Sequence, residues 1–438
     1  MKKAFAFLSM LVFAALFVEA QQRPQAYVGA EIIPISGPAI HDGVLIIKEK
    51  KIVAVGARSA VKIPEEAEIH DASGKVIMPG IIDTHSHIGG GSGGDGSGPI
   101  QPDVRILDSI NPRDTGFKRA LAGGITTVNV MPGSGHLSSG QTLFLKIRDA
   151  KIIDDMLLYD AKGKVLGALK MANGTNPIGN APFPGTRGKS VALVREQFIK
   201  AIEYKEKVRR ANGDASKMPP RDLGMEMLGE VLDRQRVVMF HTHRADDIMS
   251  VLRLAKEFNF RVVLHHVSEG WKVADEIAKA GVACSVIVID SPGGKLEAIN
   301  SSFSTATILD RAGVLVGFHT DDYITDSRFF LRSAGLAVRS GMPREKALYA
   351  MTMAGARILD LQDRIGTLEN GKDADFVVLS GDPLSVYSKV LETYVEGTKV
   401  FDRSRPEDRL YAVGGYGATK DQVADVDEDE KGAGNENQ

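Results

Sequence analysis

Apolar runs of five to eight residues alternate with segments of helical periodicity between residues 76 and 321. This alternation is typical of βα units built around a parallel sheet. Eight of the runs are predicted to be strands, at residues 78–85, 124–131, 142–146, 165–171, 236–241, 261–266, 283–288 and 314–321. The pattern therefore predicts an α/β fold in which the strands and their helices form a (β/α)8 TIM barrel.

Shorter segments rich in β-branched residues flank this region on both sides. They lie at residues 26–29, 43–48, 51–56, 375–379 and 394–401. We expect these segments to join in a small β-sandwich domain built from both ends of the chain. The predicted boundaries are 21–75 and 363–405 for the β-sandwich, 76–362 for the barrel and 406–438 for a C-terminal segment.

The first 20 residues have the features of an export signal. Two lysines precede an apolar run of about 15 residues, and Val18 and Ala20 fit the positions before a cleavage site. The run is shorter than the roughly 20 apolar residues that cross a bilayer as a helix. We therefore expect cleavage after Ala20, a periplasmic or secreted protein, and no membrane partner once the signal is removed.

The charge balance gives no sign of a nucleic-acid partner. The chain has 54 Lys and Arg against 56 Asp and Glu, which is typical of ordinary soluble proteins. Cys284 is the only cysteine, so an internal disulfide is excluded. From Thr419 onward, seven acids, two lysines and few apolar residues predict a disordered tail.

The first predicted strand ends in two histidines, in the sequence PGIIDTHSH at residues 79–87. Residues two apart on a strand share a face, so His85 and His87 point the same way and can bind one ion. The sequence therefore predicts a metal site at the end of this strand.

This motif resembles the amidohydrolase superfamily. The sequence GTLENGKDADFVV at residues 366–378 and the helix at 347–356 carry the same resemblance. The branch that the chain resembles is the exported group similar to imidazolonepropionase and metal-dependent prolidases. The resemblance implies hydrolysis of an amide-like C–N bond by a metal-activated hydroxide, at the C-terminal mouth of the barrel.

The resemblance also implies a ligand set. The family binds metal through the ends of the first, fourth, fifth, sixth and eighth strands, which here carry His85, His87, Lys170, His241, His266 and Asp321. Lys170 is expected to be carboxylated and to bridge two divalent ions, for which zinc is the expected metal. Asp321 is also the expected catalytic proton carrier.

Strand parity leaves open which histidine of the fifth strand is the ligand, and on the sixth strand it separates two neighbouring histidines. His241 and His243 share a face of the fifth strand, so either imidazole can be the ligand. On the sixth strand His265 and His266 are expected to face opposite ways, and the resemblance selects His266.

Expected substrate contacts are His136, His243 and Arg244. For His136 a role in holding a loop is favoured over substrate contact, whereas Arg244 is equally suited to an ion pair with Asp246 or Asp247. A Gly-rich segment at residues 89–98 is expected to form a mobile loop beside the site. The expected substrate is a small molecule or short peptide, such as a cyclic amide or a dipeptide.

Two other functions stay open. One is a metal-dependent deaminase of a heterocycle, which usually binds one ion without a bridging lysine, so Lys170 argues against it. The other is a non-catalytic exported binding protein on an amidohydrolase barrel, against which the retention of every expected ligand type argues. Assembly into a homo-oligomer is also left open by the sequence.

Overall fold

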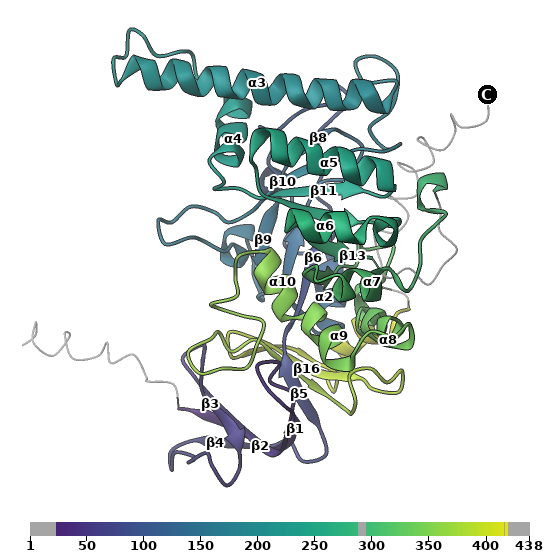
Figure 1. Ribbon diagram of the computed structural model, residues 1–438. Coiled ribbons are helices and arrows are strands. Elements are labelled where there is room, and N and C mark those ends of the chain that lie inside the picture. The colour runs from purple at the N-terminus through teal and green to yellow at the C-terminus, as the bar shows by residue number, and fades with distance from the viewer. Residues whose placement is uncertain (1–22, 288–294, 416, 419–438) are drawn as a thin grey trace, which may run out of the picture.

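Strands from the two ends of the chain meet in one mixed sheet, at the lower end of the view in Figure 1. The computed structural model of the protein describes residues 23–287, 295–415 and 417–418. The strands of this sheet are β1 (Gln25–Ile32), β2 (Ile40–Lys48), β3 (Lys51–Ala57), β4 (Glu68–Asp71), β5 (Val76–Pro79), β15 (Phe376–Leu379), β16 (Val390–Val395) and β17 (Thr398–Asp402). Their order is β17-β16-β15-β5-β1-β2-β3, with β4 beside β1. The two predicted groups of strands therefore do join, and their hydrogen bonds make one continuous sheet.

The export signal predicted for the N-terminus and the acidic tail lie outside the described residues. Within the described ranges, no helix is both long and apolar enough to cross a membrane.

The central α/β region contains two further sheets, with strand orders β6-β7-β9 and β14-β13-β12-β11-β10-β8. Their strands are β6 (Ile81–Ser86), β7 (Ile125–Val130), β8 (Ser138–Gln141), β9 (Leu143–Lys146), β10 (Leu169–Ala172), β11 (Val238–Thr242), β12 (Val262–His266), β13 (Ala283–Val286) and β14 (Val316–Phe318). The pairs β6–β7, β10–β11, β11–β12, β12–β13 and β13–β14 are parallel, as the βα pattern predicts. Backbone hydrogen bonds join the two sheets from Thr142 to Ala168 and from Asp321 to His85.

The expected third barrel strand does not pair as predicted. β8 and β9 are antiparallel to β10 and β7, so the described strands do not form one closed parallel ladder. β7 and its partner β9 are separated by residues 131–142, which hold the strand β8 and no helix. A parallel return is usually made by a helical crossover, which is missing here. The fourth strand also begins later than expected, at Leu169 and not at residue 165.

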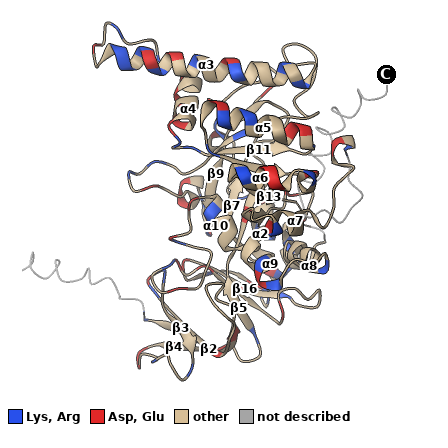
Figure 2. Ribbon diagram, viewed as in Figure 1, with Lys and Arg blue, Asp and Glu red and all other residues tan. Residues whose placement is uncertain are grey.

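Helices follow most of the parallel strands. They are α2 (Thr115–Ala122), α3 (Arg187–Ala211), α4 (Leu223–Leu232), α5 (Ala245–Phe258), α6 (Ala274–Ala280), α7 (Thr305–Arg311), α8 (Leu331–Arg339), α9 (Arg344–Met351), α10 (Met353–Ile358) and α11 (Pro406–Val413). The long helix α3 carries interspersed charges of both signs (Figure 2). Its buried Phe198 stacks on Phe258 and Phe260, which fixes α3 to the end of α5.

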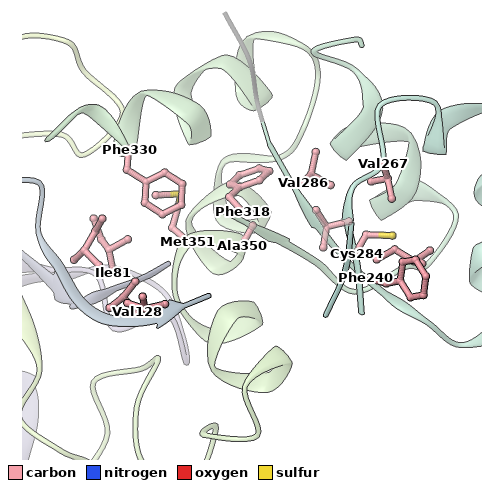
Figure 3. Packing of buried hydrophobic residues seen from close by; sticks show 14 of the residues in the cluster. Ile81, Val128, Phe240, Val267, Cys284, Val286, Phe318, Phe330, Ala350 and Met351 are labelled. Carbon is pink, nitrogen blue, oxygen red and sulfur yellow. The ribbon is translucent and has the colours of Figure 1, made fainter. Parts of the chain in front are cut away.

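The strands rest on a large apolar core (Figure 3). Phe240 on β11, Cys284 on β13 and Phe318 on β14 are all almost fully buried. Burial raises the pKa of the Cys284 thiol, so this residue packs as a small apolar side chain. Close packing on this scale holds the strand ends rigidly, and the candidate site is built on those ends.

Candidate metal centre

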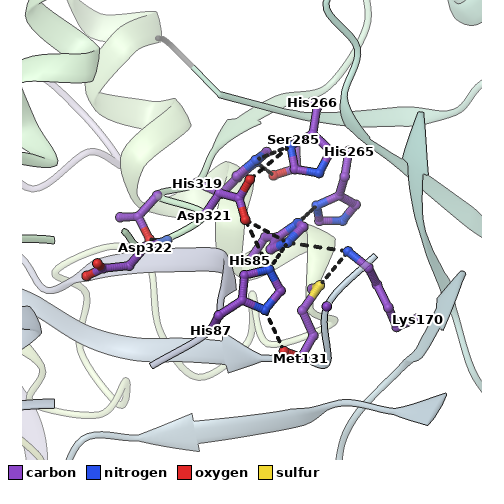
Figure 4. A network of polar contacts seen from close by, with 12 residues as sticks. His85, His87, Met131, Lys170, His265, His266, Ser285, His319, Asp321 and Asp322 are labelled. Carbon is purple, nitrogen blue, oxygen red and sulfur yellow. Dashed lines mark hydrogen bonds and ion pairs between the residues drawn. The ribbon is translucent and has the colours of Figure 1, made fainter. Parts of the chain in front are cut away.

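His85 and His87 lie at the end of β6 and face the same space, as strand parity predicts. Their Nε2 atoms are 3.2 Å apart (Figure 4). An oxygen of Asp321 lies 3.0 Å from Nε2 of His87 and 3.4 Å from Nε2 of His85. Although burial opposes it, the hydrogen bond to His87 lowers the pKa of Asp321, so this carboxylate is charged beside the imidazoles.

Lys170 reaches the same cluster from β10. Its side chain is fully buried, and Nζ lies 3.3 Å from Nε2 of His85 and 3.3 Å from the sulfur of Met131. Burial lowers the pKa of Lys170 to about 7, because the interior disfavours the ammonium form. A substantial fraction of this amine is therefore neutral near neutral pH.

His241 on β11 and His266 on β12 complete the predicted set. Their ring centroids are 4.4 Å apart. Both ring nitrogens of His241 and Nε2 of His266 are buried and have no hydrogen-bond partner among the described residues. Burial lowers the pKa of both imidazoles, so they are neutral and their lone pairs are free.

The donor atoms fit divalent metal ions. Ligands about 2.1 Å from one ion at tetrahedral angles lie about 3.4 Å apart, close to the separations between His85, His87 and Asp321. On the other side of the cluster, the donor atoms are the ring nitrogens of His241 and Nε2 of His266, which have no hydrogen-bond partner among the described residues. Donor atoms of His85, His266 and Asp321 also lie within 4.8 Å of one another. The structure thus brings all six predicted ligands together, and their coordination of metal remains a prediction.

The parity argument fails at the sixth strand. His265 and His266 both contact His85, with ring centroids 5.0 and 4.8 Å from its ring. His266 has a positive φ of 70° and Val267 one of 45°, so the backbone turns at the strand end and redirects the second imidazole. His265 Nδ1 then lies 3.1 Å from Nδ1 of His85.

A hydrogen-bonded chain that the sequence did not predict lies behind the predicted ligands. The hydroxyls of Thr84 and Ser285 are 2.6 Å apart, and the Ser285 hydroxyl is 2.7 Å from Nδ1 of His319. Nε2 of His319 lies 3.1 Å from Nδ1 of His266. His319 could have been found, because it precedes Asp321 by two residues and thus has the same strand parity.

Asp322, the acid that directly follows Asp321, is buried. It is 6% exposed, accepts a hydrogen bond from the backbone N–H of Ser327 at 3.2 Å, and also bonds to the Ser327 hydroxyl. Its carboxylate therefore shapes the loop after β14.

Of the three predicted substrate contacts, only His243 lies against the ligand cluster. Its ring stacks on His266 with centroids 5.0 Å apart, and its Nδ1 is 2.7 Å from the Ser268 hydroxyl. Arg244 donates two hydrogen bonds of 2.9 Å to Asp246, which is the ion pair that the sequence left open.

His136 holds the Gly-rich segment. Its Nε2 donates to the carbonyl of Asp95 at 2.9 Å, and the backbone N–H of Gly94 donates to Ser139 at 2.9 Å. A Cβ at Gly93 would lie 2.0 Å from Cβ of Pro132, so a glycine is needed for this close approach. The segment is therefore tied to the loop after β7, and the mobility expected for it remains a prediction.

The sequence profile of the Amidohydrolase family matches residues 76–402, which include all six predicted ligands. The chain belongs to the amidohydrolase family. Members are metal-dependent hydrolases of C–N bonds, and they share a TIM barrel with a β-sandwich domain. The predicted superfamily and enzyme class are therefore confirmed. The strand pairing within the predicted barrel differs at β8 and β9.

The names of individual relatives of this amidohydrolase indicate different substrates. Amidohydrolase tasK of Hapsidospora irregularis is 26% identical over 383 residues, which cover 78% of this chain but only 38% of that protein. An imidazolonepropionase of Alkaliphilus metalliredigens is 23% identical and covers 78% of this chain and 84% of its own length. A 5-methylthioadenosine/S-adenosylhomocysteine deaminase of Bacillus cytotoxicus is 23% identical, with 81% and 85% covered.

A solved structure is similar in fold. An amidohydrolase from Thermotoga maritima MSB8 is 33% identical, with a TM-score of 0.80 over 86% of this chain and 100% of that one.

Proposed function

We propose that this amidohydrolase cleaves an amide-like C–N bond in a cyclic amide or a short peptide, with two divalent ions bound at the cluster. Zinc is the proposed metal, because imidazole nitrogens dominate the donor set. The predicted signal at residues 1–20 supports the further proposal that the enzyme works outside the cytoplasm.

Lys170 carries the proposal. It is a fully buried lysine whose amine lies among imidazoles at the end of β10 (Figure 4). Its neutral form can react with CO2, and the resulting carbamate would add two oxygen donors to this nitrogen-rich cluster. Such a bridging group supports two ions and favours amide hydrolysis over the one-ion deaminases.

The residues divide the chemistry between them. His85, His87 and Asp321 would hold one ion, His241 and His266 the other, and the Lys170 carbamate both. When bound, the ions lower the pKa of water and polarise the scissile carbonyl. The Asp321 carboxylate then takes a proton from the attacking water and delivers it to the leaving nitrogen.

His243 is the best-placed substrate contact. Its ring lies against His266, and its Nδ1 is already engaged with Ser268, so Nε2 is the atom available to a substrate. His136 and Arg244 are held by Asp95 and Asp246, which gives them supporting roles in this arrangement.

A substrate screen tests the proposal. Protein loaded in turn with zinc and manganese is offered Xaa-Pro and other dipeptides, cyclic imides and imidazolones, and ring opening or amine release is measured. Asp321→Asn protein that retains metal is the matched control, and it should lose turnover. Turnover that persists in Asp321→Asn would show that this carboxylate is not the proton carrier.

The deaminase alternative rests on the named relative from Bacillus cytotoxicus. It requires ammonia release from an amino-substituted heterocycle and one ion per chain. Ammonia release and one ion per chain, together with no cleavage of amides, would contradict the proposed function and support the deaminase. Metal binding without turnover of either substrate class would instead indicate a binding protein.

A further inference from the structure

Two buried polar atoms face each other at the edge of the metal centre. Nε2 of His241 and Oε1 of Glu297 lie 3.7 Å apart, and neither has a hydrogen-bond partner among the described residues. His241 is 2% exposed and Glu297 is 4% exposed. Leaving a buried polar atom without a partner costs about 1–3 kcal/mol, and more for a charged group. The two atoms therefore satisfy each other or share a third partner.

The Glu297 carboxylate is fixed from its other oxygen. Oε2 accepts a hydrogen bond from the backbone N–H of Thr175 at 2.7 Å, and a guanidinium nitrogen of Arg187 lies 3.8 Å from it. A Cβ at Gly174 would lie 2.4 Å from Oε2 and would push the carboxylate away, and the positive φ of 81° at this position also favours glycine. This cradle leaves Oε1 directed at His241.

We infer that Glu297 is a positioning residue for the second metal ion and acts through His241. The inference rests on the proposed function, in which His241 is a ligand. A metal-binding histidine usually donates the N–H of its second ring nitrogen to a carboxylate or carbonyl, which fixes the tautomer. With the proton on Nε2 and directed at Glu297, Nδ1 of His241 keeps its lone pair for the ion.

The environment of the other His241 ring nitrogen is consistent with this assignment. Nδ1 of His241 is also buried and unpartnered in the part of the chain that the structure describes. Shortening the 3.7 Å separation to a hydrogen bond of about 2.9 Å needs a shift of less than about 1 Å. Binding of the ion at Nδ1 would draw the imidazole into one fixed orientation.

A carboxylate is required at this position because each of its two oxygens must accept a hydrogen bond. The Thr175 N–H occupies one oxygen, and the His241 N–H would occupy the other. A glutamine has one accepting oxygen. If that oxygen keeps its hydrogen bond from the Thr175 N–H, the amide NH2 faces His241. It then favours the His241 tautomer with the proton on Nδ1, and a protonated Nδ1 cannot bind the ion.

The test compares Glu297→Gln with wild type and with Glu269→Gln. Glu269 is a matched control, since it is also a buried loop glutamate, but its oxygens accept from Ala245, Lys272 and Asn300. Metal-free proteins are titrated with Co2+, the visible absorption of the bound ion is followed, and the ions retained after dialysis are counted. Thermal unfolding of the metal-free proteins reports on folding.

The second ion should bind about 10–100-fold more weakly in Glu297→Gln, while the first ion and the metal-free unfolding temperature stay as in wild type. Glu269→Gln should bind both ions normally. Equal affinity for the second ion in wild type and Glu297→Gln would overturn the inference, as would equal weakening of both ions with a destabilised metal-free protein. A crystal structure with an ion bonded directly to Oε1 would also overturn it, because Glu297 would then be a ligand.

The titration separates this inference from the proposed function. If wild type binds one ion, the binuclear centre is wrong and the role of Glu297 falls with it. If wild type binds two ions and Glu297→Gln binds them equally well, only the role of Glu297 is wrong.

Discussion

The backbone N–H of Asp321 donates to the carbonyl oxygen of His85 at 2.9 Å, which ties the last parallel strand to the first. A second tie lies directly behind it, where Thr320 donates its backbone N–H at 3.0 Å and its hydroxyl at 2.5 Å to Asp83. Asp83 is fully buried and two residues from His85. The proposed proton carrier and the first ligand pair are therefore held as one rigid unit.

Replacing Lys170 by alanine should lower the metal content from about two ions to about one per chain and reduce turnover sharply, because alanine cannot form the bridging carbamate. Elemental analysis of the purified variant measures the first effect. Lys164→Ala is the control, since Lys164 is 42% exposed and pairs with Glu230 away from the cluster. Two ions and near-normal activity in Lys170→Ala would contradict the binuclear assignment.

The choice between His241 and His243 is decided by comparing two alanine variants. His241→Ala should release the second ion, because both of its buried ring nitrogens lack other partners. His243→Ala should keep the metal and mainly impair substrate binding or turnover, since its Nδ1 is already engaged with Ser268. Full metal in the first variant with an empty site in the second would reverse the two roles.

Removing metal should lower thermal stability. Ions that bind only the folded protein at about 100 times their Kd stabilise it by about 2.7 kcal/mol, and six buried or partly buried donors surround the site. A chelator should lower Tm in a scan, and added zinc should restore it. His241→Ala should show a smaller shift than wild type, and an unchanged Tm in wild type would count against tight metal binding.

A buried ion cluster predicts a pH-dependent contribution to stability. Nζ of Lys146 lies 2.5 Å from Asp373, 3.0 Å from Asp375 and 3.3 Å from Glu396, and its side chain is 1% exposed. Lys146→Met should lower the free energy of unfolding by about 3–5 kcal/mol at neutral pH, because it leaves Asp375 buried without a cation and removes the most buried cation from Asp373 and Glu396. Lys51→Met is the matched control, since Lys51 contacts the same Asp373 but is 48% exposed, and its loss should cost at most about 1 kcal/mol.

The sign of the pH effect follows from the carboxylates of this cluster. Burial opposes their ionisation and raises the pKa of Asp375. Lys146 at Asp373, and Arg148 together with Lys146 at Glu396, lower the pKa of each of these other two carboxylates to about 2. Their stabilisation is fully present above the ordinary pKa of about 4 and is lost as the pH falls through about 2. The difference in unfolding free energy between wild type and Lys146→Met should therefore shrink on acidification. A difference that stays constant from pH 7 to 3 would mean that charge is not its source.

The side chains that meet at the candidate site could be predicted because they stand at strand ends, which the sequence marks clearly. The apolar run before His241 ends at the rim of β11, and Lys170 lies on β10 although the predicted start of that strand was wrong. The direction of β8 and β9 was missed because apolar periodicity is the same for parallel and antiparallel strands. The short spacing between the predicted strands at residues 124–131 and 142–146 leaves little room for a crossover helix, and it was the available signal.

Other features had no sequence signal at all. His266 reaches the cluster through a positive φ that no residue pattern indicates. Glu297 lies in the short 3-10 helix η4 (Leu296–Ala298), and its approach to His241 depends on backbone at Gly174 and Thr175 far away in the sequence. Contacts of this kind are set by tertiary packing, so only the folded chain shows them.

The strand that carries the first ligand pair continues directly from the terminal sheet, since β5 ends at Pro79 and β6 begins at Ile81. β5 gains its antiparallel neighbour β15 only after residues 80–375 have been synthesised, and the N–H of Gly80 then donates to the carbonyl of Asp375. On the ribosome, this edge of β5 must wait unpaired while the later strands are made. The pairing of β15 with β5, and not the synthesis of His85 and His87 themselves, is therefore the event that anchors this side of the candidate site.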